Sequence, residues 1–114
     1  MNYVQMNSGK QVIDSVKEFV MNNYKDPELS LGMAAEYASV STGYLSGLFK
    51  KESGTNFVKY LTDVRMEKCM QLLKTTDMKT YEIAYETGFS NPHYFSISFK
   101  KYTGMSPSEF RAKE

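Results

Sequence analysis

Residues 84–107 read AYETGFSNPHYFSISFKKYTGMSP, and they decide the fold because residues 35–57, AEYASVSTGYLSGLFKKESGTNF, repeat their pattern. Identical residues recur at a spacing of 50 positions in the two stretches: Tyr44 and Tyr94, Ser46 and Ser96, Phe49 and Phe99, Lys50–Lys51 and Lys100–Lys101, and Gly54 and Gly104. Upstream of these residues the spacing is 49, so the second copy carries one extra residue at its turn. A repeat of this period indicates one supersecondary unit that is used twice.

The composition limits the classes of protein that this chain can belong to. Its 114 residues suffice for one domain or for two very small domains that share an interface. The sequence has neither an apolar run of about 20 residues nor a signal-peptide pattern, so we expect no membrane partner and a cytoplasmic location. The net charge of +1 is low for a nucleic-acid-binding chain, but the lysine pairs of the repeat favour a local basic face.

The sequence contains no candidate residues for catalysis or for binding a metal or cofactor. The carboxylates are not spaced with a histidine or a second carboxylate in a cleft-forming pattern, and no glycine-rich phosphate loop or nucleophile motif is present. One cysteine, Cys69, and one histidine, His93, do not form a metal coordination shell. We therefore predict no enzymatic activity, no metal and no cofactor, and we expect Cys69 to be a small buried residue on a helix in a reducing compartment.

Apolar periodicity and capping residues predict an all-α chain of about seven helices. The expected helices span residues 11–24, 31–38, 42–53, 56–74, 80–87 and 92–102, and a short last helix starts at 107. Residues 1–9 are polar and lack periodicity, so we expect a disordered leader there. The expected subdomains are residues 10–55 and 76–114, with a connecting helix at 56–75 between them.

Each repeat then has the plan of a helix-turn-helix, in which a short helix, a tight turn and a second helix follow one another. In the second helix of each copy, one set of residues has inward spacing: Tyr44, Leu45, Leu48 and Phe49, and Tyr94, Phe95, Ser98, Phe99 and Tyr102. The opposite faces form the outward ridges, which consist of Gly43, Ser46, Gly47 and Lys50 in the first copy and His93, Ser96, Ile97 and Lys100 in the second. A slim ridge that ends in a lysine pair suits a helix that lies deep in a DNA groove.

Several strings of the sequence resemble the DNA-binding domain of the AraC/XylS family of bacterial transcription regulators. They are FKKESG, RMEKCMQLL, IAYETGFSN and FSISFKKYTGMSPSEFR, and the resemblance covers roughly residues 12–111. It implies two helix-turn-helix units that are joined by a long central helix, with both recognition helices in successive major grooves on one DNA face. It also implies a transcription regulator, either an activator or a repressor, for which RNA polymerase is a candidate partner, and a sensing, dimerisation or receiver domain that precedes this one in the full protein. A complete single-domain regulator is the alternative.

The predicted interface consists of twelve residues in the two recognition helices. The base-facing residues are Thr42, Gly43, Ser46, Gly47, Pro92, His93, Ser96 and Ile97, and the phosphate-binding residues are Lys50, Lys51, Lys100 and Lys101. Gly47 and Ile97 stand where the resemblance leads one to expect arginine, the commonest reader of guanine, so we expect an A·T-rich site that is read largely by shape. Because the two ridges differ, the double-stranded DNA site should be asymmetric.

Three interpretations stay open from the sequence alone. The chain is either a DNA-binding domain or a helical module for protein–protein interaction, although serine, glycine and lysine are poor anchors for a protein partner. Gly43 and Gly47 either allow the backbone to approach DNA closely or mark a helix that reads little. Arg65 lies between the repeats and is expected to make a structural ion pair or hydrogen bond.

Overall fold

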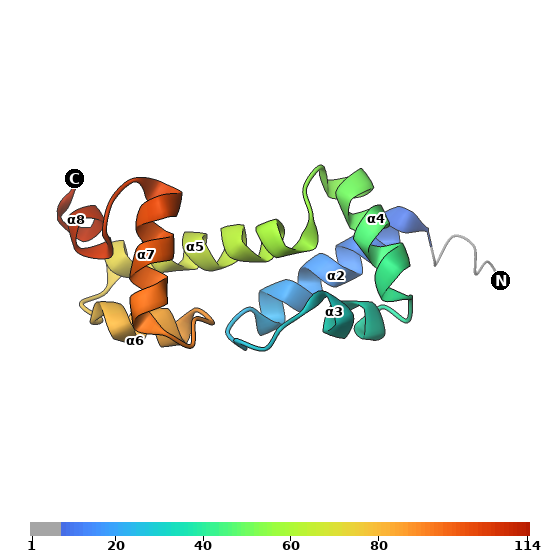
Figure 1. Ribbon diagram of the computed structural model, residues 1–114, viewed down its shortest axis with the longest axis horizontal. Coiled ribbons are helices and arrows are strands. Elements are labelled where there is room, and N and C mark those ends of the chain that lie inside the picture. The colour runs from blue at the N-terminus through green and yellow to red at the C-terminus, as the bar shows by residue number, and fades with distance from the viewer. Residues whose placement is uncertain (1–7) are drawn as a thin grey trace. The chain divides into compact units, whose positions relative to one another are not determined.

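The computed structural model describes residues 8–114, and within this range the chain is all helical (Figure 1). The helices are α2 (Gly9–Asn23), α3 (Leu31–Tyr37), α4 (Thr42–Ser53), α5 (Phe57–Thr75), α6 (Thr80–Glu86), α7 (Pro92–Thr103) and α8 (Pro107–Ala112). The predicted all-α fold with two helix-turn-helix motifs is confirmed, and each bound lies within two residues of its expected position. The leader predicted for residues 1–9 lies mostly outside the described residues, and Gly9 already belongs to α2.

The described chain divides into two compact units. The first unit contains residues 8–23 and Glu28–Thr62, and the second contains Tyr24–Pro27 and Asp63–Glu114. The units divide α5 between them, whereas the sequence suggested a separate connecting helix at 56–75. The predicted subdomains at 10–55 and 76–114, with a connecting helix at 56–75, remain a prediction.

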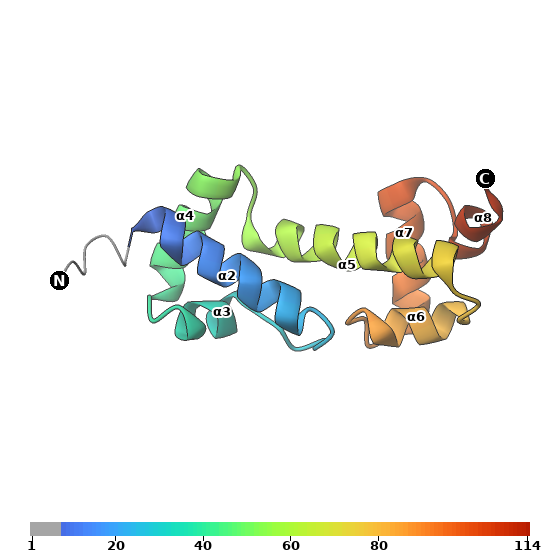
Figure 2. The same ribbon diagram turned by 180° about the vertical axis from the view of Figure 1, so that it is seen from behind.

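In the first unit, α2, α3 and α4 pack side by side, as both views of the ribbon show (Figures 1 and 2). The core contains the buried side chains of Val16, Val20, Ala34, Leu45 and Phe49. The ring of Phe49 makes edge contacts with Phe57 and Tyr60 of α5, at centroid distances of 5.8 and 5.4 Å. Burial of these apolar side chains is what holds α4 against α2 and α3.

In the second unit, α7 packs against α6 and α8. The core consists of Met66, Cys69, Leu73, Ile83, Ala84, Phe95 and Phe99. The phenyl rings of Phe89, Phe95, Phe99 and Phe110 form a chain of contacts with centroid distances between 5.1 and 5.7 Å. Cys69 is fully buried, as expected, and its Sγ lies 3.1 Å from the Thr87 hydroxyl. Burial raises the pKa of the Cys69 thiol to about 11.

A segment of the α2–α3 connection, Tyr24–Pro27, belongs to the second unit, and we call it the 24–27 segment. Arg65 of α5 donates from Nε to the Tyr24 carbonyl at 2.9 Å and from a terminal nitrogen to the Asp26 carbonyl at 2.8 Å. Lys25 adds a hydrogen-bonded ion pair with Glu86 at 2.9 Å. The predicted structural role of Arg65 is confirmed, since its guanidinium donates to two backbone carbonyls of the segment that follows α2.

Candidate nucleic-acid interface

The outward ridge of α7 is set by the way the helix begins and ends. The Asn91 side chain accepts hydrogen bonds from the backbone N–H groups of His93 (2.9 Å) and Tyr94 (3.1 Å), and Pro92 occupies the first helical position. The helix ends at Gly104, whose φ of 87° is left-handed. Local signals thus fix where α7 begins and ends. The side of the helix that faces solvent is set by the residues that it buries.

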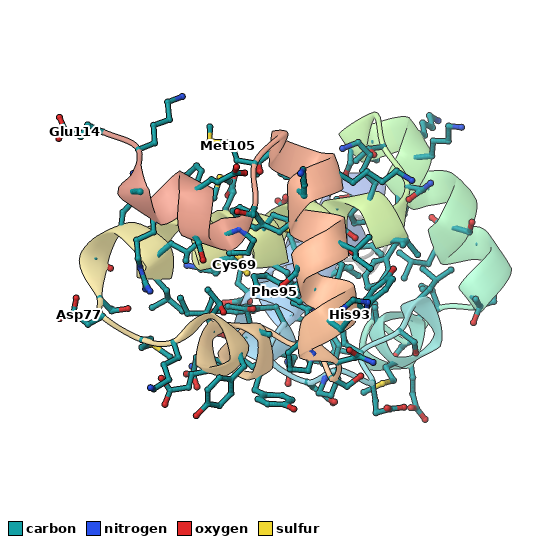
Figure 3. The ribbon with its side chains drawn as sticks, turned by 60° about the vertical axis from the view of Figure 1, so that its left-hand side comes forward. Cys69, Asp77, His93, Phe95, Met105 and Glu114 are labelled. Atoms are coloured by element: carbon teal, nitrogen blue, oxygen red, sulfur yellow. The ribbon has the colours of Figure 1, made fainter. Side chains whose placement is uncertain are left out.

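That buried face turns the predicted ridge toward solvent. Phe95 and Phe99 are fully buried, whereas His93 and Lys100 are exposed and the Ile97 side chain is 55% exposed. Figure 3 shows His93 and Phe95 on opposite sides of α7. An isoleucine that is more than half exposed on a surface helix has no role in the core, and it is available to a ligand.

The ridge of α7 borders a shallow open hollow of the second unit. Its lining consists of His93, Ser96, Ile97, Lys100, Lys101 and Ser106. The structure thus brings together five of the six residues predicted for α7, while the sixth, Pro92, is half-buried at the start of the helix. Ser106, at the N-terminus of α8, is a lining residue that the sequence did not single out.

One carboxylate that contacts the lining of this hollow is already engaged. Glu109 accepts a hydrogen bond from the Ser106 backbone N–H at 2.8 Å, and the Ser106 hydroxyl caps the Glu109 N–H at 3.1 Å. These hydrogen bonds are the main cause of the lowered pKa of Glu109, and Lys100 lowers it further. Because Glu109 is committed to the cap of α8, it leaves Lys100 and Lys101 available to an anion.

In the first unit, α4 presents the corresponding ridge. Ser41 caps the helix by accepting from the Tyr44 N–H at 3.1 Å, and Gly54 ends it with a φ of 76°. All six residues predicted for this helix are exposed: Thr42, Gly43, Ser46, Gly47, Lys50 and Lys51. A Cβ atom added at Gly43 or Gly47 would meet nothing within 4 Å, so the protein itself does not require glycine at either position.

The lysine pairs occupy the last turns of both helices. Lys50 and Lys51 lie in the last turn of α4, and Lys100 and Lys101 lie in the last turn of α7. All four are exposed, and within residues 8–114 none forms an ion pair. Lysines in a last turn interact favourably with the helix dipole, and in this arrangement their ammonium groups also remain free for phosphate.

Three tyrosines that were predicted to face inward lie outside the core. Tyr44 is 50% exposed and Tyr94 is 62% exposed, so the expectation that they pack inward is wrong. On each helix the buried arc is filled by the next residue, Leu45 or Phe95, which turns the tyrosine to the edge of the exposed face. Tyr102 is also partly exposed, but its hydroxyl donates to Asp63 at 2.8 Å.

Comparisons with known proteins agree with this geometry. Residues 34–113 match the family model described as "Helix-turn-helix domain". A transcriptional regulator with an AraC-type DNA-binding domain from Chromobacterium violaceum is 30% identical, with a TM-score of 0.82 over 90% of this chain and 91% of that one. The chain belongs to the AraC-type helix-turn-helix family.

Other AraC-type relatives are more similar in sequence. The transcriptional regulatory protein YesN of Bacillus subtilis is 44% identical over 93% of this chain and 30% of its own length. The C-terminal domain of the response regulator yesN from Fusobacterium nucleatum is 41% identical, with a TM-score of 0.82 over 84% of this chain and 93% of that one. This chain spans about a third of the length of the curated relatives that it matches.

The AraC-type family consists of DNA-binding domains of transcription regulators, which are not enzymes. The function of this chain is therefore sequence-specific binding of double-stranded DNA, and the alternative of a protein-interaction module that does not bind DNA is set aside. In the part of the chain that the structure describes, no helix has the length and apolar character of a membrane span. The same residues contain no group of three or more histidine, cysteine or acidic side chains that could hold a metal ion.

Proposed function

We propose that the chain binds DNA by placing α4 and α7 in successive major grooves on one face of the duplex. The observation that carries the proposal is that both helices expose the same ridge, with a serine at its centre and a free lysine pair at its end. The length of α5 supports it, because 19 residues make a helix of about 28 Å and same-face major grooves lie about 34 Å apart. Since the helix is shorter than this spacing, we expect the DNA to bend when both grooves are engaged.

In this proposal the two ridges read different sequences. Ser46 and Ser96 donate to or accept from base edges, His93 contacts a base or phosphate, and Ile97 packs on a thymine methyl group. Gly43 and Gly47 allow the α4 backbone to approach the bases closely. Without an arginine on either ridge, the preferred site is A·T-rich and asymmetric, with a large contribution from DNA shape.

For the full-length protein we propose a cytoplasmic regulator in which a receiver domain precedes the DNA-binding domain. The support comes from the structures of C-terminal domains of two response regulators, yesN from Fusobacterium nucleatum and AraT from Geobacillus stearothermophilus, which are 41% and 37% identical to this chain. RNA polymerase is the proposed protein partner at the promoter.

The test of DNA binding is fluorescence anisotropy with duplexes selected by this chain from a randomised pool, measured across a salt series. We expect affinity to fall steeply with salt, and the double variant Lys50→Ala/Lys100→Ala to lower the slope by about two, since each phosphate-bound lysine contributes about one. The affinity of the variant should fall for all sequences alike, because phosphate contacts carry no sequence information.

The matched control is Lys10→Ala/Lys113→Ala, which removes the same charge from exposed positions outside the two helices. It should leave the slope close to that of the unmodified chain. Salt-insensitive binding, an absence of binding to any duplex, or equal slopes for the two double variants would contradict the proposal.

A further inference from the structure

The residues that are identical in the two copies of the repeat divide into two groups. Phe49 and Phe99 are fully buried, and Gly54 and Gly104 hold the left-handed backbone that ends each helix, so both pairs have a structural reason to be the same. The exposed lysine pairs are explained by the helix dipole and by DNA binding. Tyr44 and Tyr94 also recur in register, and neither the core nor a helix end explains them.

The hydroxyl groups of Tyr44 and Tyr94 have no partner in the part of the chain that the structure describes. Within residues 8–114 no hydrogen bond reaches the Oη atom of Tyr44 or Tyr94, and no ring contact covers either side chain. Tyr102, about two turns nearer the end of α7, shows the contrast, because its hydroxyl donates to Asp63. A large aromatic side chain with a free hydroxyl, present at the same place on both recognition helices, is suited to an external acceptor.

The position of the tyrosines on each helix indicates which part of the DNA could accept a hydrogen bond from their hydroxyls. Tyr44 and Lys51, and likewise Tyr94 and Lys101, are seven residues apart, which is nearly two turns and about 10 Å along the helix. Each pair therefore forms a second exposed stripe, rotated from the base-facing ridge toward the side of the helix. A helix is about 10–12 Å wide and the major groove about 12 Å, so side chains on the flank of an inserted helix meet the phosphate backbone.

We propose that Tyr44 and Tyr94 bind backbone phosphates through their hydroxyls and so fix the depth and register of α4 and α7 in the grooves. The proposal rests on the proposed function, since it requires both helices to enter major grooves. Tyrosine is among the side chains that contact phosphate oxygens in protein–DNA complexes. In each stripe the tyrosine anchors the N-terminal half of the helix and the lysine anchors its C-terminal end.

A neutral donor leaves a different signature from a lysine. It adds affinity without releasing a counterion, so removing it should weaken binding but leave the salt slope unchanged. Because phosphates carry no sequence information, the loss should be the same for the selected duplex and for a duplex of shuffled sequence. A base contact would instead reduce only the affinity for the selected duplex.

The experiment compares Tyr44→Phe, Tyr94→Phe and Lys101→Gln with the unmodified chain by anisotropy on both duplexes across a salt series. Tyr102→Phe is the matched control, because it removes the same atom from a tyrosine of α7 whose hydroxyl is already bound to Asp63. We expect each of the first two variants to lose roughly three- to tenfold in affinity on both duplexes with an unchanged slope. Lys101→Gln should lower the slope by about one, and Tyr102→Phe should bind as tightly as the unmodified chain.

A scan with neutral methylphosphonate linkages locates the contact. At the phosphate that Tyr94 binds, neutralisation should weaken the unmodified chain but weaken Tyr94→Phe less, which is a coupling between the two groups. Unchanged affinity of Tyr44→Phe and Tyr94→Phe, a loss confined to the selected duplex, or the absence of coupling at every linkage would overturn the inference. Failure of the unmodified chain to bind any duplex would instead overturn the proposed function, and it would be seen before any variant is made.

Discussion

At the turn of each helix-turn-helix, one residue has a left-handed backbone: Ser39 with a φ of 60° and Gly88 with a φ of 97°. The two positions are equivalent, because they lie 49 residues apart. Ser39 is exposed, so the first copy tolerates a side chain in this conformation at a modest cost. Gly88 is buried, and a Cβ atom there would lie 2.2 Å from the Tyr24 carbonyl oxygen and 2.6 Å from Arg65 Nε.

Exchanging the residue types of the two turns should therefore have unequal effects. Gly88→Ser should destabilise the protein by about 3 kcal/mol or more, because it adds the left-handed strain to a clash with backbone and guanidinium atoms. Ser39→Gly should change the free energy of unfolding by less than about 1 kcal/mol, since relief of strain is offset by the flexibility of glycine in the unfolded chain. Urea denaturation followed by circular dichroism measures both values, and similar losses for the two variants would contradict this explanation.

Individual residues also show where the sequence was insufficient. Helical periodicity placed Leu45, Phe49, Phe95 and Phe99 in the core correctly, because they lie at the centre of the buried arc. It misplaced Tyr44 and Tyr94, which lie at the border of that arc, where packing rather than spacing decides the burial of a side chain. The twelve predicted DNA contacts are located on the two helices by the structure, but their contacts with DNA remain predictions.

At the scale of elements, the helix bounds were predictable because their signals are local. Ser30, Asn91 and Ser106 accept hydrogen bonds from the first turns of α3, α7 and α8, and glycines end α4 and α7. The 24–27 segment could not be assigned to the second unit in this way. Its hydrogen bonds to Arg65 join residues that are 41 and 39 positions apart, and no local pattern in the sequence marks such contacts.

The glycines of α4 allow a test that separates the two interpretations of this helix. Gly43→Ala and Gly47→Ala should each stabilise the protein by up to about 1 kcal/mol, because both positions are helical and an added Cβ atom meets nothing within 4 Å. If the backbone of α4 approaches the bases closely, the same variants should weaken binding to the selected duplex. Thermal unfolding and anisotropy on the same samples measure the two effects, and variants that are more stable yet bind equally well would show that α4 reads little.

At the scale of the whole molecule, α4 and α7 share the residues predicted to bind phosphate and differ at several of the residues predicted to face the bases. Ser46 matches Ser96 and the lysine pairs match, whereas Gly43 corresponds to His93 and Gly47 to Ile97. The DNA site should therefore consist of two unlike halves, each read by one helix.

This asymmetry should be removable by substitution. The variant Gly43→His/Gly47→Ile gives α4 the residues of α7 at the two ridge positions where the helices differ, which are exposed in α4 and have open space around them. Selection from a randomised duplex pool should then yield two similar half-sites in direct repeat, about one helical turn apart, in place of two unlike ones. The unmodified chain is selected in parallel, and recovery of the same asymmetric site by both proteins would contradict the assignment of these positions to base reading.

Because the 24–27 segment belongs to the second unit, it limits where the duplicated chain can be cut into two halves. The sequence repeat suggests two interchangeable halves, but the second unit includes four residues that precede the whole of the first repeat. A fragment that begins within α5 would leave the half-buried Arg65 guanidinium without the Tyr24 and Asp26 carbonyls, and it would empty the space that Gly88 keeps for the Tyr24 carbonyl. A protein that is cut or grafted at the apparent boundary between the repeats would thus have an incomplete second half, because the second unit combines Tyr24–Pro27 with residues that follow the first unit. The two copies of the repeat are therefore not independent parts of the chain.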